Sequence, residues 1–252
     1  MISKEKIEEL AKKYHTAPFP NVSREYFQHL FLSELYKLPD SEKLLFKGGT
    51  ALRIIYGSPR FSEDLDFSIG SSTDGASLKE FIESIFIGVL SEIEKVGIKV
   101  ELGGKSDATS GGYFGRASFT APNLMPIVVE INVSARNAGE LKGEISSIVG
   151  DFLPPYTVIH LSEEELVAEK IFGALLNRKK PRDFYDLYFM MRKGMLSANH
   201  KKKLAEVKEE ILVSARQASL SKELGVFLPA DQQLIVRNFY QALESELNRN
   251  IR

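Results

Sequence analysis

The sequence predicts an α+β protein in which a mixed sheet with flanking helices is followed by a C-terminal helical bundle. Short β-branched and aromatic runs fill the middle of the chain, a long amphipathic helix precedes most of them, and almost everything after Ser162 has helical periodicity. We therefore expect an α/β domain over residues 1–161, with a helical lead-in, and a helical domain over residues 162–252. The two could also pack as one unit.

Proline, glycine and capping residues set the expected elements of the first domain. Pro18 and Pro20 break a helical lead-in of about forty residues, and helical periodicity resumes after Thr50, a suitable N-cap. An amphipathic helix begins at Leu78 and ends near Gly97. Strands are expected over residues 64–69, 98–102, 113–121, 127–133 and 156–161.

The C-terminal third is expected to be helical throughout. Ser162 and the three glutamates after it form a capping-box sequence, which is typical of a helix start. Helices are expected over residues 163–177, 181–192, 198–217 and 230–248, with ends placed to within ~2–4 residues.

Composition limits the classes of function. Of 252 residues, 43% are hydrophobic and 27% are charged, as in an ordinary soluble globular protein, and the absence of cysteine excludes disulfides and thiolate chemistry. The charged N-terminus is unlike a signal peptide and no apolar run approaches the ~18 residues of a membrane span, so we expect a cytoplasmic protein. A net charge of −1 leaves nucleic-acid binding to local basic clusters at residues 178–182 and 201–203, which could equally be solvated helix ends.

Asp64 and Asp66 are the most informative pair in the chain. Both alternate with the apolar residues Leu65, Phe67 and Ile69, which predicts a half-buried strand with the two carboxylates on one face. Like charges this close repel, so the pair is easiest to understand if a divalent cation or water lies between them.

The segment Lys47-Gly48-Gly49-Thr50 precedes this strand and is a candidate phosphate-binding turn. Two glycines let the backbone approach a ligand closely, and the helix after them offers free N–H groups and a positive dipole end. Alone, the segment is more often just a turn. Glu130, which interrupts the apolar run 127–133, is the candidate third carboxylate, although an exposed strand end could carry it without any function.

Four charged residues of the helical part complete the candidates. Lys170 suits a triphosphate as a point charge, but a solvated lysine paired with a neighbouring glutamate is the plainer interpretation. Asp183 falls in the first turn of the helix that Pro181 begins, where a carboxylate is favourable in any case. Asp186 shares its helix face and could approach Lys170 or Arg182, forming a basic phosphate clamp.

In this order the motifs resemble those of the AbiEii/AbiGii-type nucleotidyltransferase toxins, members of the polymerase-β-like nucleotidyltransferase superfamily. The resemblance covers about residues 45–191, and it rests on the combination, since each motif alone is weak. The segments that carry it are 47–52, 60–67, Glu130 in its strand, Lys170 in its helix and 182–187.

The resemblance implies a metal-dependent enzyme that moves a nucleoside monophosphate from an NTP to an acceptor. The implied acceptor is the 3′ end of tRNA, and the implied setting is a toxin–antitoxin or phage-defence system with a cognate antitoxin encoded alongside. The candidate catalytic residues are Asp64, Asp66, Glu130, Lys170, Asp183 and Asp186; Asp64, Asp66 and Glu130 would hold Mg²⁺ or Mn²⁺. The candidate nucleotide-binding residues are Lys47, Gly48, Gly49, Thr50, Ser62, Lys170 and Arg182.

The sequence departs from the usual superfamily pattern at two positions, and two other functions remain as alternatives. Thr50 stands where the wider superfamily usually has serine, and Glu130 stands where it usually has aspartate. The same fold could instead modify a small molecule or a protein hydroxyl, or the chain could be a non-catalytic nucleotide-binding interaction protein. The four histidines show no metal-ligand spacing, so zinc is not expected.

Overall fold

The structure, a computed structural model, describes residues 2–70, 75–103, 107–109, 111–136 and 141–251. It divides the chain into two compact units. Unit 1 contains residues 1–57 and 61–161, and unit 2 contains Ser58–Arg60 together with Ser162–Arg252. The three-residue segment before the aspartate strand therefore belongs to the helical unit.

Unit 1 is built on an eight-stranded mixed sheet with the order β3-β5-β6-β2-β1-β8-β7, in which β4 pairs with β5. Strands β2 and β6 are parallel, as are β1 and β8, and the other pairs are antiparallel. The strands are β1 (Leu44–Lys47), β2 (Leu65–Ile69), β3 (Lys99–Leu102), β4 (Asp107–Thr109), β5 (Gly112–Thr120), β6 (Ile127–Ser134), β7 (Gly143–Ile148) and β8 (Tyr156–Leu161). The candidate aspartates thus lie at a central strand.

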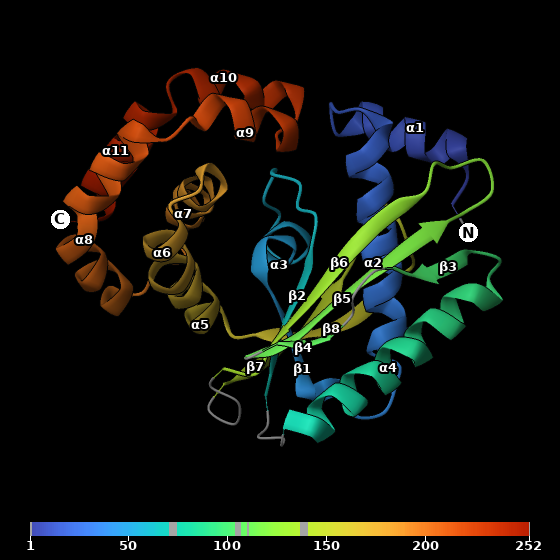
Figure 1. Cartoon of the computed structure of the whole chain (residues 1–252). Coiled ribbons are helices and arrows are strands. Elements are labelled where there is room, and N and C mark those ends of the chain that lie inside the picture. Colours follow the sequence, from blue (N-terminus) through green and yellow to red (C-terminus); the bar gives the residue numbers. More distant parts are fainter. Residues whose placement is uncertain (1, 71–74, 104–106, 110, 137–140, 252) are drawn as a thin grey trace. The chain divides into compact units, whose positions relative to one another are not determined.

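Helices α2 (Ser23–Leu35) and α4 (Gly75–Lys95) pack beside each other against one face of this sheet (Figure 1). Phe27 of α2 stacks on Phe119 of β5 at 5.2 Å between ring centroids, and Phe86 of α4 meets Phe67 of β2 at 6.5 Å. Helix α1 (Lys4–Lys13) leads into α2, and the short helix α3 (Gly48–Ile54) connects β1 to the segment before β2. The aromatic contacts bury Phe67 at the centre of β2.

Unit 2 is helical. Tyr185 of α7 stacks on Phe239 of α11 at 5.8 Å between ring centroids, so these two helices share the centre of its core. The helix containing Lys170 changes to π-helical geometry over Glu169–Leu175. The other helices are α5 (Glu163–Ala168), α6 (Leu176–Arg178), α7 (Pro181–Lys193), α8 (Ala198–Gln217), α9 (Leu220–Phe227), α10 (Gln233–Arg237) and α11 (Phe239–Asn250).

The predicted fold class is confirmed, with corrections at individual elements. The prediction that Thr50 caps a helix is wrong, because α3 begins at Gly48 with Lys47 as its N-cap. Strands β1, β4 and β7 and helix α9 were not expected, and the helix predicted over 230–248 is interrupted between α10 and α11. Among the described residues, no helix is long and apolar enough to cross a membrane.

Candidate active site

Asp66 lies at the middle of the sheet, between two strands that fix its surroundings. It stands opposite Lys47 of β1 and beside Asn132 of β6 in the strand register. The Asn132 side-chain amide donates a hydrogen bond to Asp66 Oδ1 at 3.2 Å. One carboxylate oxygen is thereby oriented by the neighbouring strand.

Gly48 faces the other oxygen of the same carboxylate. A Cβ atom placed on Gly48 would lie 2.2 Å from Asp66 Oδ2, and the residue has φ +83°. A side chain is disfavoured at such a φ, and here its Cβ would also collide with the carboxylate. Two independent effects therefore favour glycine at this position. The glycine turn and the aspartate strand therefore lie directly against each other in unit 1.

The backbone around Asp64 is held by side chains. The Thr50 hydroxyl, which is fully buried, donates to the Asp64 carbonyl oxygen. The amide of Gln28 donates to the carbonyl oxygens of Ser62 and Glu63 at 3.1 and 3.0 Å. The Thr50 hydroxyl proton is thus engaged by the main chain, and only the lone pairs of its oxygen remain to accept a further hydrogen bond.

Glu130 lies on the same face of the sheet as Asp66. Asp66 pairs with Asn132 in the register of β2 and β6, and Glu130 precedes Asn132 by two residues on β6. Its carboxylate forms an ion pair with Arg116, its cross-strand neighbour on β5, and its side chain is 36% exposed. Within the described residues, no three histidine, aspartate or glutamate side chains are grouped as metal ligands. In this structure Glu130 is accordingly an ion-paired strand residue, and the assignment as a third ligand stays a prediction.

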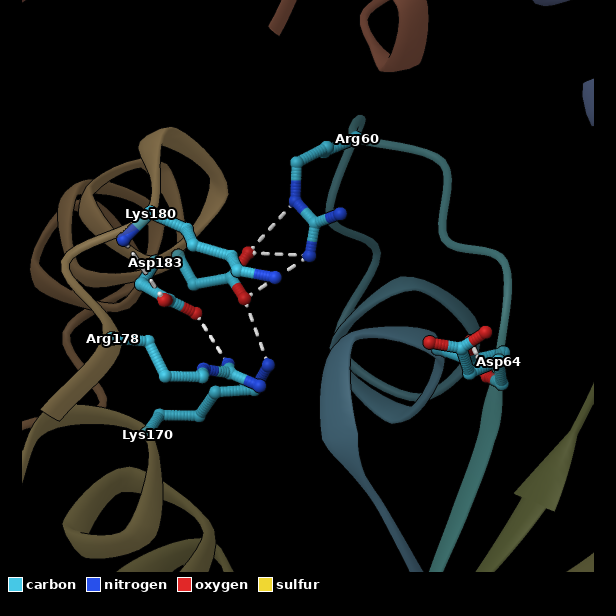
Figure 2. A network of polar contacts seen from close by, with 8 residues as sticks. Arg60, Asp64, Lys170, Arg178, Lys180 and Asp183 are labelled. Carbon is cyan, nitrogen blue, oxygen red and sulfur yellow. Dashed lines mark hydrogen bonds and ion pairs between the residues drawn. The ribbon is translucent and has the colours of Figure 1, made fainter. Parts of the chain in front are cut away.

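Two basic residues of unit 2, Arg60 and Lys170, converge on one buried carboxylate, that of Asp186. The Arg60 guanidinium donates to both of its oxygens, with Nε at 2.9 Å and Nη2 at 3.0 Å. Lys170 Nζ donates to Oδ2 at 2.8 Å. Figure 2 labels Arg60 and Lys170, and Arg60 lies on the short segment that precedes the aspartate strand.

The charges of this triad sum to +1 in a nearly dry environment. Side-chain exposure is 1% for Asp186, 3% for Arg60 and 10% for Lys170. Burial opposes ionisation of Asp186, but Arg60 and then Lys170 outweigh that effect, so the pKa of the carboxyl lies below its ordinary value. Asp186 is therefore a carboxylate near neutral pH, and Lys170 is the member of the triad nearest solvent.

Asp183 plays a more local part. Its carboxylate accepts from the Lys180 backbone N–H at 3.3 Å, which caps the start of α7, and from Arg178 Nη2 at 2.6 Å (Figure 2). The interpretation of Asp183 as a helix-start charge thus matches its contacts. The expected approach of Asp186 to Lys170 is present, and the second cation on Asp186 is Arg60, where the sequence pattern had suggested Arg182.

The structure thus gathers the candidates into two groups. Lys47, Gly48, Gly49, Thr50, Ser62, Asp64, Asp66 and Glu130 belong to unit 1, and Lys170, Arg182, Asp183 and Asp186 belong to unit 2. Sequence reasoning missed the partners Gln28, Arg60 and Asn132. Arg60 had one usable signal, since it stands four residues before Asp64 within the motif itself.

Comparison with known proteins shows the family to which the chain belongs. The family model of the nucleotidyl transferase AbiEii toxin, type IV TA system, matches residues 30–250. A crystal structure of a candidate nucleotidyltransferase from H. pylori is similar with a TM-score of 0.51 at 20% identity, covering 91% of this chain and 96% of that chain. JHP933 from Helicobacter pylori gives 0.50 at 17% identity, covering 99% and 96%.

At these identities the two structures support the fold alone, and no curated protein matches the chain. The family match is the stronger finding, because it spans both the aspartate strand and the buried triad. The chain belongs to the AbiEii family of nucleotidyltransferase toxins from type IV toxin–antitoxin systems.

Proposed function

We propose that this chain transfers a nucleoside monophosphate from an NTP to the 3′ end of tRNA, with Asp64 and Asp66 as the centre of a divalent-metal site. The observation that carries the proposal is the fit between Asp66 and Gly48. The turn at Gly48 has no room for a Cβ atom and lies directly against the Asp66 carboxylate. A phosphate bound by this turn and a metal ion bound by this carboxylate would therefore be neighbours.

The residues present fit a magnesium ion. Mg²⁺ is usually held by one or two carboxylates, with water and substrate phosphate oxygens completing its shell, so that two strand aspartates are a sufficient protein donor set. When bound, Mg²⁺ or Mn²⁺ would neutralise phosphate charge and make the acceptor hydroxyl more acidic. Glu130 would join this set only by leaving Arg116, whereas Asn132 already orients Asp66.

The chain's own groups would then divide the work. The backbone of Gly48 and Gly49, at the start of α3, would approach the triphosphate closely. Lys170 would contribute a positive charge to triphosphate binding. Arg60 also neutralises Asp186, and Lys170 Nζ, which has three N–H donors, donates one hydrogen bond to that carboxylate. The acceptor oxygen would attack the α-phosphorus as the bond to pyrophosphate breaks.

The tRNA acceptor is supported by the toxin family and by the basic residues before α7. Transfer to the 3′ end would block aminoacylation and halt translation, an outcome suited to a toxin in the cytoplasm. A cognate antitoxin is the expected partner, and phage defence is one setting in which such a pair would operate.

The direct test is transfer of label to tRNA. Purified protein would be incubated with total tRNA, Mg²⁺ and each α-labelled NTP in turn. Label in tRNA would support the acceptor and reveal the preferred nucleotide. Label in protein or in a small molecule would overturn the tRNA assignment and leave transfer itself in place, whereas an absence of label in every fraction would contradict the proposal.

We expect Asp66→Ala to lower transfer at least ~100-fold, the order seen when one electrostatic group of an active site is removed. Folding should persist, because Asp66 is only half-buried. The rate of label incorporation and the thermal unfolding midpoint would be measured together. Glu101→Ala, which removes an exposed carboxylate on β3 of the same sheet, is the matched control. Retained transfer in Asp66→Ala would refute the metal assignment.

A further inference from the structure

The segment that leads into the aspartate strand is held by side chains. Strand pairing of β2 begins at Leu65, so the carbonyl groups of residues 62–64 lie before the ladder. All three accept hydrogen bonds from side chains: Ser62 and Glu63 from the Gln28 amide, and Asp64 from the Thr50 hydroxyl. The backbone just before the two carboxylates is therefore fixed by two residues.

Gln28 is the more distant of these two residues and the more informative. It lies on α2, its side chain is 1% exposed, and it is 34 and 35 residues away from its two partners in the sequence. Since both partners are carbonyl oxygens, the amide nitrogen must be the atom that faces them. Gln28 also precedes the region matched by the family model, so that match says nothing about it.

A second contact from the same helix reaches the same segment. Arg24 Nη1, one turn before Gln28, lies 3.2 Å from Glu63 Oε1. Helix α2 thus engages both the side chain of Glu63 and the backbone around it. Since α2 packs against the sheet through Phe27, it provides a rigid base for these contacts.

We propose that Gln28 is a positioning residue for nucleotidylyl transfer, which orients Asp64 and Asp66 by fixing the carbonyl groups of Ser62 and Glu63. The inference rests on the proposed role of the two aspartates. Gln28 contacts neither carboxylate and acts through the backbone. Without its two donors, the partly buried carbonyl groups of Ser62 and Glu63 lose these partners and the segment shifts to recover them.

A small shift matters more for the rate than for the fold. Misplacing reacting groups by about 1 Å can cost about 100-fold in rate. The side chains that would contact the triphosphate are unchanged by a substitution at Gln28. The expected signature is consequently a fall in kcat with a much smaller change in KM for the NTP.

The test compares Gln28→Met and Gln28→Glu with Tyr36→Phe. Methionine keeps the length of the side chain without the donors, and glutamate keeps its shape while replacing donors with acceptors. Tyr36 is the matched control, because its hydroxyl, at the end of α2, also lies within hydrogen-bond distance of two main-chain carbonyl oxygens, those of Leu44 at 2.8 Å and Ile159 at 2.6 Å. Each variant would be studied as the full chain.

Three quantities would be measured: kcat and KM for transfer, the thermal unfolding midpoint, and hydrogen exchange of peptides covering residues 61–66. For both Gln28 variants we expect kcat to fall by ~10- to 100-fold, KM to change less than about threefold, and exchange in 61–66 to accelerate. Tyr36→Phe should lower the unfolding midpoint while kcat and exchange in 61–66 stay near wild type.

The outcomes separate the two proposals. Wild-type kcat and unchanged exchange in a folded Gln28 variant would overturn the positioning role, even with transfer established. Equal loss of kcat in Tyr36→Phe would show a general effect of destabilisation and would overturn it too. If the wild-type chain transfers no nucleotide, the proposed function fails, and the exchange measurement alone decides whether Gln28 fixes the segment. If Gln28→Met does not fold, Gln28→Glu decides.

Discussion

Gly48 shows how a single absent side chain defines the site. Its φ of +83° and the position of Asp66 Oδ2 disfavour any other residue for two separate reasons. Conformational strain would be shared by the other positive-φ glycines that the structure describes, whereas among the glycines with a described environment only Gly48 would bring a Cβ into collision with a carboxylate. The two effects can be separated by comparison with Gly57, which has φ +77° and no atom within 4 Å of the point where a Cβ would lie.

We expect Gly48→Ala and Gly57→Ala to lose similar stability from backbone strain, ~1–2 kcal/mol each. Transfer should fall at least ~100-fold only in Gly48→Ala, because only there does the new methyl group displace the carboxylate. Denaturant unfolding and label incorporation would be measured for both. Equal activity losses in the two variants would mean that strain, and not the contact with Asp66, matters.

At this scale, sequence patterns identified residues but not their partners. Alternation of Asp64 and Asp66 with apolar residues was enough to predict β2, because alternation is a local property. The contacts of Gln28, Asn132 and Arg60 join residues 34 to 126 positions apart, and no local pattern records them. Glu130 was singled out for its apolar surroundings, but its cross-strand partner Arg116 became visible only with the register.

Among the elements, the helix that carries Lys170 and the helix that carries Asp186 act as a pair. Lys170 lies in the π-helical segment Glu169–Leu175, a geometry found often at functional sites, and Asp186 lies on the buried face of α7. Arg60 binds the same carboxylate bidentately, so that the pairing of Asp186 does not depend on Lys170 alone. Lys170 is consequently the residue of the triad whose removal should destabilise the fold least.

We expect Lys170→Ala to weaken NTP binding by ~10- to 100-fold, the range for losing a charged hydrogen bond of about 1.5–3 kcal/mol. The unfolding midpoint should change little, since Arg60 still neutralises Asp186. Titration of the NTP by calorimetry would check the affinity, with Lys193→Ala, an exposed residue at the end of α7, as the control. Unchanged affinity would remove the main support for a phosphate clamp.

Elements with a clear periodicity of apolar residues were predicted from the sequence, and elements without such a periodicity were not. Helix α8 was expected with its observed bounds, because its apolar spacing and Ser197 cap agree. Strand β1 has four buried residues in succession and β7 is mostly exposed, so neither shows alternation. Helix α9 follows α8 after two residues and carries no proline or capping bond to mark its start.

For the molecule as a whole, the balance of charge bears on RNA binding. The net charge is −1, so any attraction to the proposed tRNA acceptor must come from local residues. The structure neutralises part of the main cluster: Arg178 pairs with Asp183, and Lys179 pairs with Glu210 at 2.8 Å. Lys180 and Arg182 are then the residues of this cluster best placed to contribute charge to an RNA.

We expect the double variant Lys180→Ala/Arg182→Ala to bind tRNA more weakly and with a shallower salt dependence. If both side chains contact phosphates, the slope of log K against log salt should fall by about 1.4–1.8. Arg178→Ala/Lys179→Ala, which removes two ion-paired charges, should change it less. Filter binding over a series of salt concentrations would measure both slopes, and identical slopes in the two variants would rule out the assignment.

Arg60 belongs to unit 2 in space but precedes most of unit 1 in the sequence, and it stands 126 positions before Asp186. At a synthesis rate of about 5–20 residues per second, a ribosome makes Arg60 roughly 6–25 seconds before its carboxylate partner exists. During that interval, the nascent chain holds an arginine whose buried counter-ion has not been made. Any product of interrupted translation that ends before Asp186 lacks the triad entirely, so this toxin can be assembled only late in its own synthesis.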